Sequence, residues 1–74
     1  MGKGLEELKG YLRESYNLED IIFNERRDQG VFLFSIDKNT GEDVDILITN
    51  TNKVFLNGKE QEGLSPVSVW TLDV

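Results

Sequence analysis

Carboxylates are the most concentrated chemical groups in this chain, and they crowd one short stretch: Asp37, Glu42, Asp43 and Asp45. A carboxylate pair can do acid–base chemistry when a cleft or a neighbouring like charge raises the pKa of one member. These residues occupy turn-forming and outward-facing positions of the sequence, where water surrounds a side chain. We therefore do not expect them to be catalytic.

Other catalytic groups are missing. The sequence has no histidine and no cysteine, so neither nucleophilic catalysis with a positioned base nor a zinc or copper site is expected. No glycine-rich run precedes a lysine at the spacing of a phosphate-binding loop. We predict a protein that is not an enzyme, with no catalytic residue, no metal and no cofactor.

The stretch from Asp37 to Asp45 places oxygen-bearing side chains at alternate positions, as calcium-binding loops do. Its glycine, Gly41, comes one position too early for that motif, and Ile48 stands where a bidentate glutamate is needed. Turn formation explains the stretch without a metal. Two interpretations remain for its acids: a solvated hairpin tip, or an acidic patch that docks on a basic partner.

Charge narrows the classes of partner. The chain of 74 residues has 14 acidic and 8 basic side chains, a net charge of −6. Such a field repels phosphate backbones and anionic lipids, so we expect no direct nucleic-acid or membrane binding. No targeting or membrane-spanning segment is recognisable, which favours a cytoplasmic protein. The length predicts a single domain, residues 1–74, with a radius of gyration of about 11 Å.

Hydrophobic spacing separates one helix from a series of strands. Apolar residues recur at helical spacing from Leu5 to Tyr16, and Asn17 is expected to end this helix in a left-handed conformation. The spacing then changes to two, which is typical of strands. The expected strands are Ile21–Asn24, Val31–Asp37, Val44–Thr49, Val54–Leu56 and Val67–Leu72. Short loops favour an α+β fold, in which an N-terminal amphipathic helix packs on one face of a four- to five-stranded antiparallel meander sheet.

The chain after Leu56 gives weaker signals. Asn57 and Gly58 form a dipeptide typical of type I′ hairpins. The polar run that follows, residues 59–62, has no apolar side chain to bury, so it predicts a short edge strand at best. Trp70, on the predicted last strand, is expected to pack in the core or at an interface.

The strand register decides which side chains face the helix. A three-residue loop, 39–41, pairs Ile36 with Val44. A register slipped by one residue would set Phe34 against Asp45, so the sequence favours the first. The predicted core face of the sheet then consists of Ile21, Phe23, Phe32, Phe34, Ile36, Val44, Ile46 and Ile48.

The same register leaves an apolar row on the face that the helix cannot cover: Ile22, Leu33, Leu47 and Phe55. Exposed apolar rows with polar surroundings usually mark contact surfaces. The row is a candidate interface, and the alternative is that the C-terminal segment around Trp70 folds back over it.

These features predict a small, acidic, non-enzymatic protein-binding module. One form of this hypothesis is an inhibitor from a mobile element that acts on a nucleic-acid-handling protein. The alternative is a structural homodimer that forms through the uncovered sheet face, since small domains gain stability by association.

Overall fold

The predicted helix and meander are both present in the computed structural model, which describes residues 3–72. Helix α1 (Lys3–Tyr16) is followed by five antiparallel strands that pair in chain order. The molecule is thus an α+β fold, and its Cα radius of gyration is 11.0 Å. The strands are β1 (Leu18–Arg27), β2 (Gly30–Asp37), β3 (Asp43–Thr49), β4 (Lys53–Leu56) and β5 (Lys59–Leu64).

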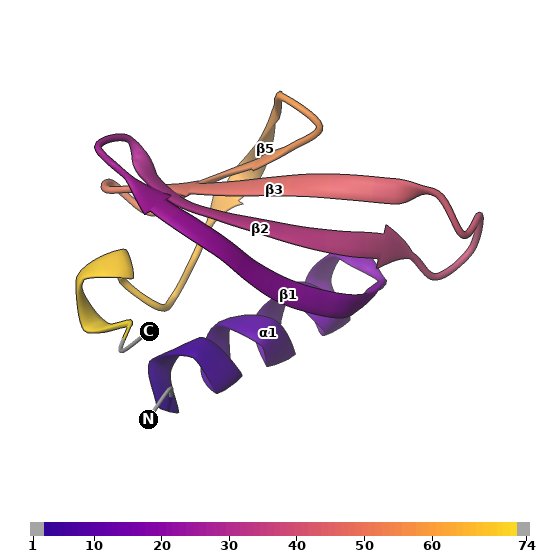
Figure 1. Ribbon diagram of the computed structural model, residues 1–74, viewed down its shortest axis with the longest axis horizontal. Coiled ribbons are helices and arrows are strands. Elements are labelled where there is room, and N and C mark those ends of the chain that lie inside the picture. Colours follow the sequence, from indigo (N-terminus) through magenta and orange to yellow (C-terminus); the bar gives the residue numbers. More distant parts are fainter. Residues whose placement is uncertain (1–2, 73–74) are drawn as a thin grey trace.

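Helix α1 lies against one side of the sheet, which we call the inner face (Figure 1). Leu8 and Leu12, one helical turn apart, have no exposed surface. Asn17 ends the helix with a φ of 57°, as its left-handed tolerance predicts. The buried apolar core consists of Leu8, Leu12, Leu18, Ile21, Val31, Leu33, Val44, Ile46, Ile48, Val54, Val67, Val69 and Leu72.

The β2–β3 register differs by one residue from the one that the sequence favoured. Phe34 lies opposite Asp45, and Leu33 lies opposite Ile46. The register that seemed unfavourable, because it sets an aromatic ring against a carboxylate, is the one adopted. The predicted pairing of these two strands is therefore wrong.

The loop between β2 and β3 explains the difference. The Asp37 carboxylate accepts hydrogen bonds from the backbone N–H groups of Asn39 and Thr40, at 2.7 Å and 3.1 Å. The N–H of Asp37 donates to the carbonyl of Glu42 at 2.8 Å. Because the Asp37 side chain begins the turn, the loop spans residues 38–41, one residue more than expected.

A one-residue shift turns every side chain of a strand to the other face. Phe32, Phe34 and Ile36, predicted for the core, therefore point away from α1. Leu33, predicted for the uncovered row, is only 1% exposed and belongs to the core. Ser35 shares the inner face, where its hydroxyl donates to the Val44 carbonyl at 2.9 Å.

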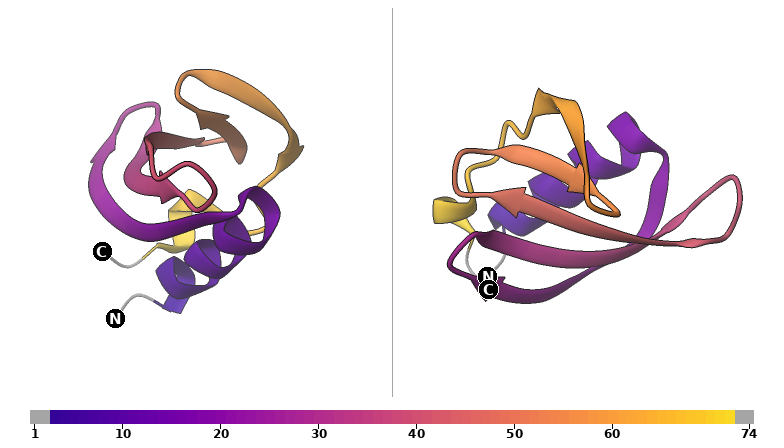
Figure 2. Two further views of the ribbon diagram at one scale, coloured as in Figure 1. Left: turned by 90° about the vertical axis from the view of Figure 1, so that its right-hand side faces the viewer. Right: turned by 90° about the horizontal axis from the view of Figure 1, so that it is seen from above.

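Strand β1 keeps its predicted faces because it is irregular. Its pairing with β2 shifts between Glu19 and Ile22, and again after Phe23. Asp20, inside the first irregularity, has a φ of 53°. Such bulges add a residue and bend the strand. Ile21 thus stays buried, and the sheet curls around α1 (Figure 2).

The predicted last strand, 67–72, is wrong. Its centre is a 3-10 turn, η1 (Val69–Thr71). The Ser65 hydroxyl accepts from the Val67 N–H at 3.1 Å, and the Ser68 hydroxyl accepts from the Trp70 N–H at 3.2 Å. These local side-chain bonds compete with a sheet ladder for the same donors.

The C-terminal segment closes one end of the core on the inner side of the sheet (Figure 1). Val69 is fully buried there. The Arg26 guanidinium holds η1 by donating to the carbonyls of Val69 and Leu72, at 3.1 Å and 3.2 Å. Trp70 points outward and is 72% exposed, so it does not pack in the core; the other predicted role, packing at an interface, stays a prediction. The segment does not cover the opposite face of the sheet.

Strand β5 is an edge strand, as the polar run predicted, although it is longer than expected. Asn57 and Gly58 have φ angles of 51° and 81°, which are the left-handed values that a type I′ turn requires. No residue of β5 is buried. Its charged side chains suit an edge that must not pair with other chains.

Two tyrosines of α1 provide a pH-dependent contact. The hydroxyls of Tyr11 and Tyr16 lie 3.3 Å apart, and their rings meet edge to face. Burial of the Tyr16 side chain raises its pKa from 10.0 to about 12. The hydrogen bond to Tyr11 and the charge of the Tyr11 phenolate act in the same direction.

We expect this shift to make folding pH-dependent in alkali. The folded state holds the Tyr16 proton more tightly than the unfolded state, so the stabilisation is complete below pH 10 and is lost as the pH rises toward 12. Phenolate absorbance measures the titration, and the difference between wild type and Tyr16→Phe isolates Tyr16. A difference curve with its midpoint at 10 would contradict the prediction.

Candidate protein-docking face

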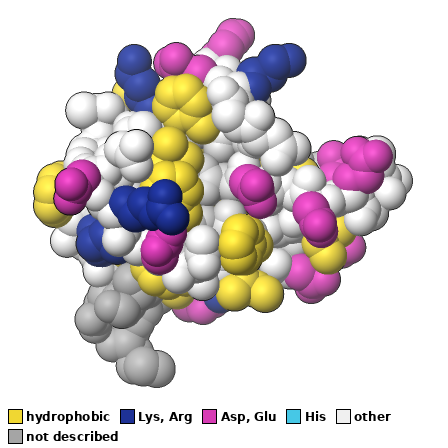
Figure 3. All heavy atoms as spheres, turned by 45° about the horizontal axis from the view of Figure 1, so that its top comes forward, with side chains coloured by type: hydrophobic (Ala, Val, Ile, Leu, Met, Phe, Trp, Pro, Cys, Tyr) yellow, Lys and Arg dark blue, Asp and Glu magenta, His cyan; other side chains and the backbone are white. Residues whose placement is uncertain are grey.

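The sheet face opposite α1, which we call the outer face, is apolar across its middle. The apolar residues of the outer face are Ile22, Phe32, Phe34, Ile36, Leu47 and Phe55. Ile22 is 60% exposed and Phe34 is 48% exposed, although both lie in the middle of strands. Figure 3 shows hydrophobic side chains in a band over this side of the molecule, with acidic side chains gathered toward the β2–β3 hairpin.

The pairing of the strands sorts the outer face into three rows that run across them. The middle row contains Ile22, Phe34 and Asp45. The row nearer the β2–β3 loop contains Glu19, Ile36 and Asp43. The row on the other side contains Glu25, Phe32, Leu47, Phe55 and Glu60. The middle row thus has an acidic row on one side and a mainly apolar row on the other.

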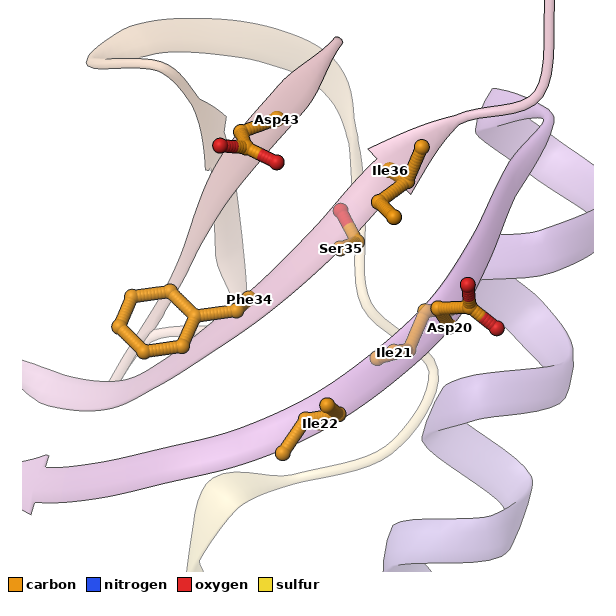
Figure 4. Close-up of a pocket in the computed structure, with 7 residues that line it drawn as sticks. All are labelled: Asp20, Ile21, Ile22, Phe34, Ser35, Ile36 and Asp43. Atoms are coloured by element: carbon orange, nitrogen blue, oxygen red, sulfur yellow. The ribbon is translucent and has the colours of Figure 1, made fainter. Parts of the chain in front are cut away.

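Shallow hollows lie at the middle row and beside it. The first, of about 420 Å³, lies between β1 and β2. Figure 4 shows Ile22 and Phe34 on neighbouring strands of this hollow, with Asp20 and Asp43 at its borders. It is lined by Asp20, Ile21, Ile22, Phe34, Ser35, Ile36 and Asp43.

Two further hollows adjoin the first. One of about 340 Å³ lies between β2 and β3, where Phe34, Asp43 and Asp45 contribute to its lining. The third, of about 160 Å³, lies over the mainly apolar row, where Phe32, Leu47 and Phe55 contribute to its lining, and it reaches Asp45 of the middle row. Neighbouring hollows share Phe34, Asp43 or Asp45 as lining residues. We call the three together the outer groove.

The acids of the outer groove have no basic partner among the side chains of residues 4–72. The ion pairs in this part of the chain are Lys9–Glu6, Arg27–Glu25 and Lys53–Glu60. Asp20, Asp43 and Asp45 are all exposed and take part in none of them. The groove therefore presents negative charge that nothing in the described chain neutralises.

Comparisons with protein-family models, with curated proteins and with solved structures give no significant match. Function is therefore inferred from the residues of this chain.

Basic side chains on the outer face already interact with other residues of the chain. The Arg27 guanidinium lies 5.1 Å from the centre of the Phe32 ring and pairs with Glu25. Lys53 pairs with Glu60 at 3.6 Å. The outer face consequently offers apolar surface and carboxylates to a partner, and little free positive charge.

Three of the predicted row residues lie on the outer face: Ile22, Leu47 and Phe55, with Leu47 opposite Phe55 as predicted. Leu33 does not, since it is buried on the inner face. Sequence reasoning placed Phe34 in the core, although it is central to the groove. The signal that could have found it is Asp37, a residue type whose side chain often starts a turn.

The predicted acidic patch is split between two places. Asp43 and Asp45 border the outer groove. Asp37 is half-buried and holds the β2–β3 loop through its carboxylate, and Glu42 follows that loop and accepts a hydrogen bond from the Asp37 N–H through its carbonyl. Asp20, which was not predicted for the patch, lines the groove instead. Its position depends on the irregular pairing of β1 with β2, which the local sequence does not predict.

The described residues include no group of three or more acidic side chains that could hold a metal ion. Helix α1, the longest helix in residues 3–72, is too short and too polar to cross a membrane. The side chains of the outer groove offer apolar surface and carboxylates.

Proposed function

We propose that this protein is a non-enzymatic protein-binding module, and that its outer groove docks a partner segment with both apolar and basic side chains. The observation that carries the proposal is an exposed apolar strip, Ile22 and Phe34, bordered by Asp20, Asp43 and Asp45 without basic partners. Apolar surface of this kind with a polar border is typical of contact sites. The expected compartment is the cytoplasm.

The two parts of the groove have different physical roles. Phe34 and Ile22 supply apolar area whose removal from water favours binding, and large central side chains of this type dominate the energy of many interfaces. The carboxylates select a basic partner, repel acidic ones and accelerate encounter. A net charge of −6 adds to this steering.

A basic partner agrees with the more specific hypothesis of an inhibitor from a mobile element. Proteins that handle nucleic acids bind phosphates through lysine and arginine. A groove bordered by Asp43 and Asp45 would compete for those side chains while Phe34 contacts apolar surface beside them. This form of the proposal makes the partner's nucleic-acid site the target.

Charge argues against the homodimer alternative. Two outer faces in contact would bring Asp43 and Asp45 of both copies into one interface, and Arg27 and Lys53 are already paired within each copy. Like charges buried together oppose association. A different protein with free basic side chains fits the groove better than a second copy does.

Capture from a lysate of the cells that make the protein tests the proposal. Immobilised wild type is compared with Phe34→Ser and with Trp70→Ser, which removes a still more exposed aromatic side chain from η1. We expect specific proteins to be retained by wild type and by Trp70→Ser, and at least tenfold less by Phe34→Ser, which corresponds to about 1.4 kcal/mol.

The salt dependence of the same capture tests the carboxylates. Retention should fall as salt is raised, and Asp43→Asn with Asp45→Asn should weaken it. If Phe34→Ser retained the same proteins in the same amounts as wild type, the outer groove would not be the docking site.

A further inference from the structure

The outer face already contains one arginine stacked on an aromatic ring. Phe32 of β2 lies opposite Glu25 of β1. The Arg27 guanidinium lies 5.1 Å from the centre of the Phe32 ring and pairs with the Glu25 carboxylate. The attraction of the cation to the ring and the charged pair act together there. An aromatic ring beside a carboxylate of the neighbouring strand therefore holds a guanidinium on this face.

Phe34 has the same surroundings without the arginine. It lies two residues after Phe32, so both rings are on the outer face, and Asp45 of β3 lies directly opposite it. Asp43, two residues before Asp45, lies on the same face of β3. Neither aspartate forms an ion pair with the side chains of residues 4–72. The Phe34 side chain is 48% exposed, so part of its ring is open to a partner.

Two hollows meet at Phe34, and together they suit one long side chain with an apolar stem and a cationic end. Phe34, Asp43 and Asp45 contribute to the lining of the hollow of about 340 Å³. Ile22 and Ile36 line the neighbouring hollow of about 420 Å³, which also reaches Phe34 (Figure 4). Long basic side chains lay their methylene groups along apolar surface and keep the charged end free to pair. A side chain that lies flat in this way needs no deep cleft.

Arginine fits these surroundings better than lysine does. Its guanidinium is planar, stacks on aromatic faces and carries five N–H donors in a fork that matches carboxylates. Asp43 and Asp45, two residues apart in one strand, have Cα atoms about 6.7 Å apart, so one guanidinium can reach both. A lysine ammonium is a compact and strongly hydrated charge, so it gains less from the ring.

Provided that the outer groove docks a partner, as proposed above, we infer that Phe34, Asp43 and Asp45 form a recognition site for one arginine side chain of that partner. The guanidinium lies on the Phe34 ring, as Arg27 lies on Phe32, and donates to the two aspartates. The methylene groups of the arginine cover the apolar lining of the neighbouring hollow.

Three short peptides with blocked ends test the inference. Each has two leucines on either side of a central arginine, lysine or citrulline, which keeps the shape of arginine without its charge. Amide chemical shifts of isotope-labelled full-length protein locate each peptide. We expect the arginine peptide to shift the amides of Phe34, Asp43 and Asp45. It should bind about threefold or more tighter than the lysine peptide, and about tenfold or more tighter than the citrulline peptide.

Variants identify the part played by the ring. Phe34→Leu keeps an apolar side chain and removes the ring, so it should abolish the preference for arginine while the affinity for the lysine peptide changes less than about twofold. Trp70→Leu removes an exposed ring from η1 and should leave the preference unchanged. Equal binding of the arginine and lysine peptides to wild type, or a preference that survives Phe34→Leu, would overturn the arginine site.

The peptides also separate the arginine site from the docking function. If the arginine and lysine peptides bind equally and both shift the Phe34 amide, the groove docks basic segments without selecting arginine, and the docking function stands. If the shifts spread evenly over the acidic residues, or no amide shifts, the arginine site is wrong. Undiminished capture from lysate by Phe34→Ser would then contradict the docking function as well.

Discussion

Replacing Gly30 with alanine is expected to destabilise the protein by about 3 kcal/mol or more. Gly30 has a φ of 152°, a conformation that residues with a Cβ atom rarely adopt. A Cβ atom at this position would lie 2.0 Å from the Ile48 carbonyl oxygen and 2.8 Å from the Thr49 Cα. Both contacts are with backbone, so no side chain can move to relieve them.

Gly41→Ala provides the matched control. Gly41 also has a positive φ, 76°, but no atom lies within 4 Å of the position of its Cβ. We expect this variant to lose about 1 kcal/mol, the ordinary penalty for a left-handed residue. Urea unfolding measures both variants. Equal losses would show that the close approach of β2 to β3 at Gly30 is not present.

Leu33→Ala is expected to cost about 3 kcal/mol, within the range for buried leucines. Leu33 is 1% exposed and lies opposite Ile46 on the inner face, so its truncation removes buried apolar atoms and leaves a cavity. Phe34→Ala, one residue later, should cost less than about 1 kcal/mol because the ring is half exposed.

Which of the two variants loses more stability distinguishes the two possible registers of β2 and β3. The register favoured by the sequence places Phe34 in the core and Leu33 outside, so it requires the opposite order. Urea unfolding of the two variants under the same conditions decides between them. A larger loss for Phe34→Ala would contradict the register of the structure.

Much of the fold was predictable because it depends on local chemistry. Helical spacing from Leu5 to Tyr16 identified α1, and Asn17 identified its end. Asn57 and Gly58 identified the β4–β5 turn. Each of these features is set by residues that are neighbours in the sequence, so no tertiary contact is needed to find them.

The β2–β3 register was not predictable from hydrophobic pattern alone. Alternation along β2 places apolar side chains on both faces, so the pattern cannot decide between Leu33 and Phe34 for the core. The decision rests on the length of one loop, which the hydrogen bonds of the Asp37 carboxylate set. A preference for pairing Phe34 with an apolar neighbour led to the wrong choice.

The one-residue shift in the β2–β3 register explains which apolar residues of the candidate site were predicted correctly. Ile22, Leu47 and Phe55 were assigned correctly to the outer face because β1, β3 and β4 keep their predicted faces. Phe34 was missed and Leu33 was wrongly included because β2 does not. Asp20 was missed since the irregularity in β1 depends on how that strand fits β2.

The register also explains why the outer face is so apolar. Turning β2 over moves two phenylalanines and Ile36 out of the core, and places Val31, Leu33 and Ser35 in it. Core stability alone would favour the opposite arrangement, since burying a phenylalanine is worth about 1.5–3 kcal/mol. Apolar side chains kept at an exposed position are the expected signature of a contact surface.

The register of β2 and β3 is the claim on which the outer groove depends, and contacts between Hα protons measure it directly. Phe34 and Asp45 are directly opposite and lie between the hydrogen-bonded pairs Leu33–Ile46 and Ser35–Val44, an arrangement in which Cα atoms are about 4.5 Å apart. A strong nuclear Overhauser effect between the Hα protons of Phe34 and Asp45 is the predicted result. A strong effect between Phe34 and Ile46 in its place would contradict the register and, with it, the outer groove.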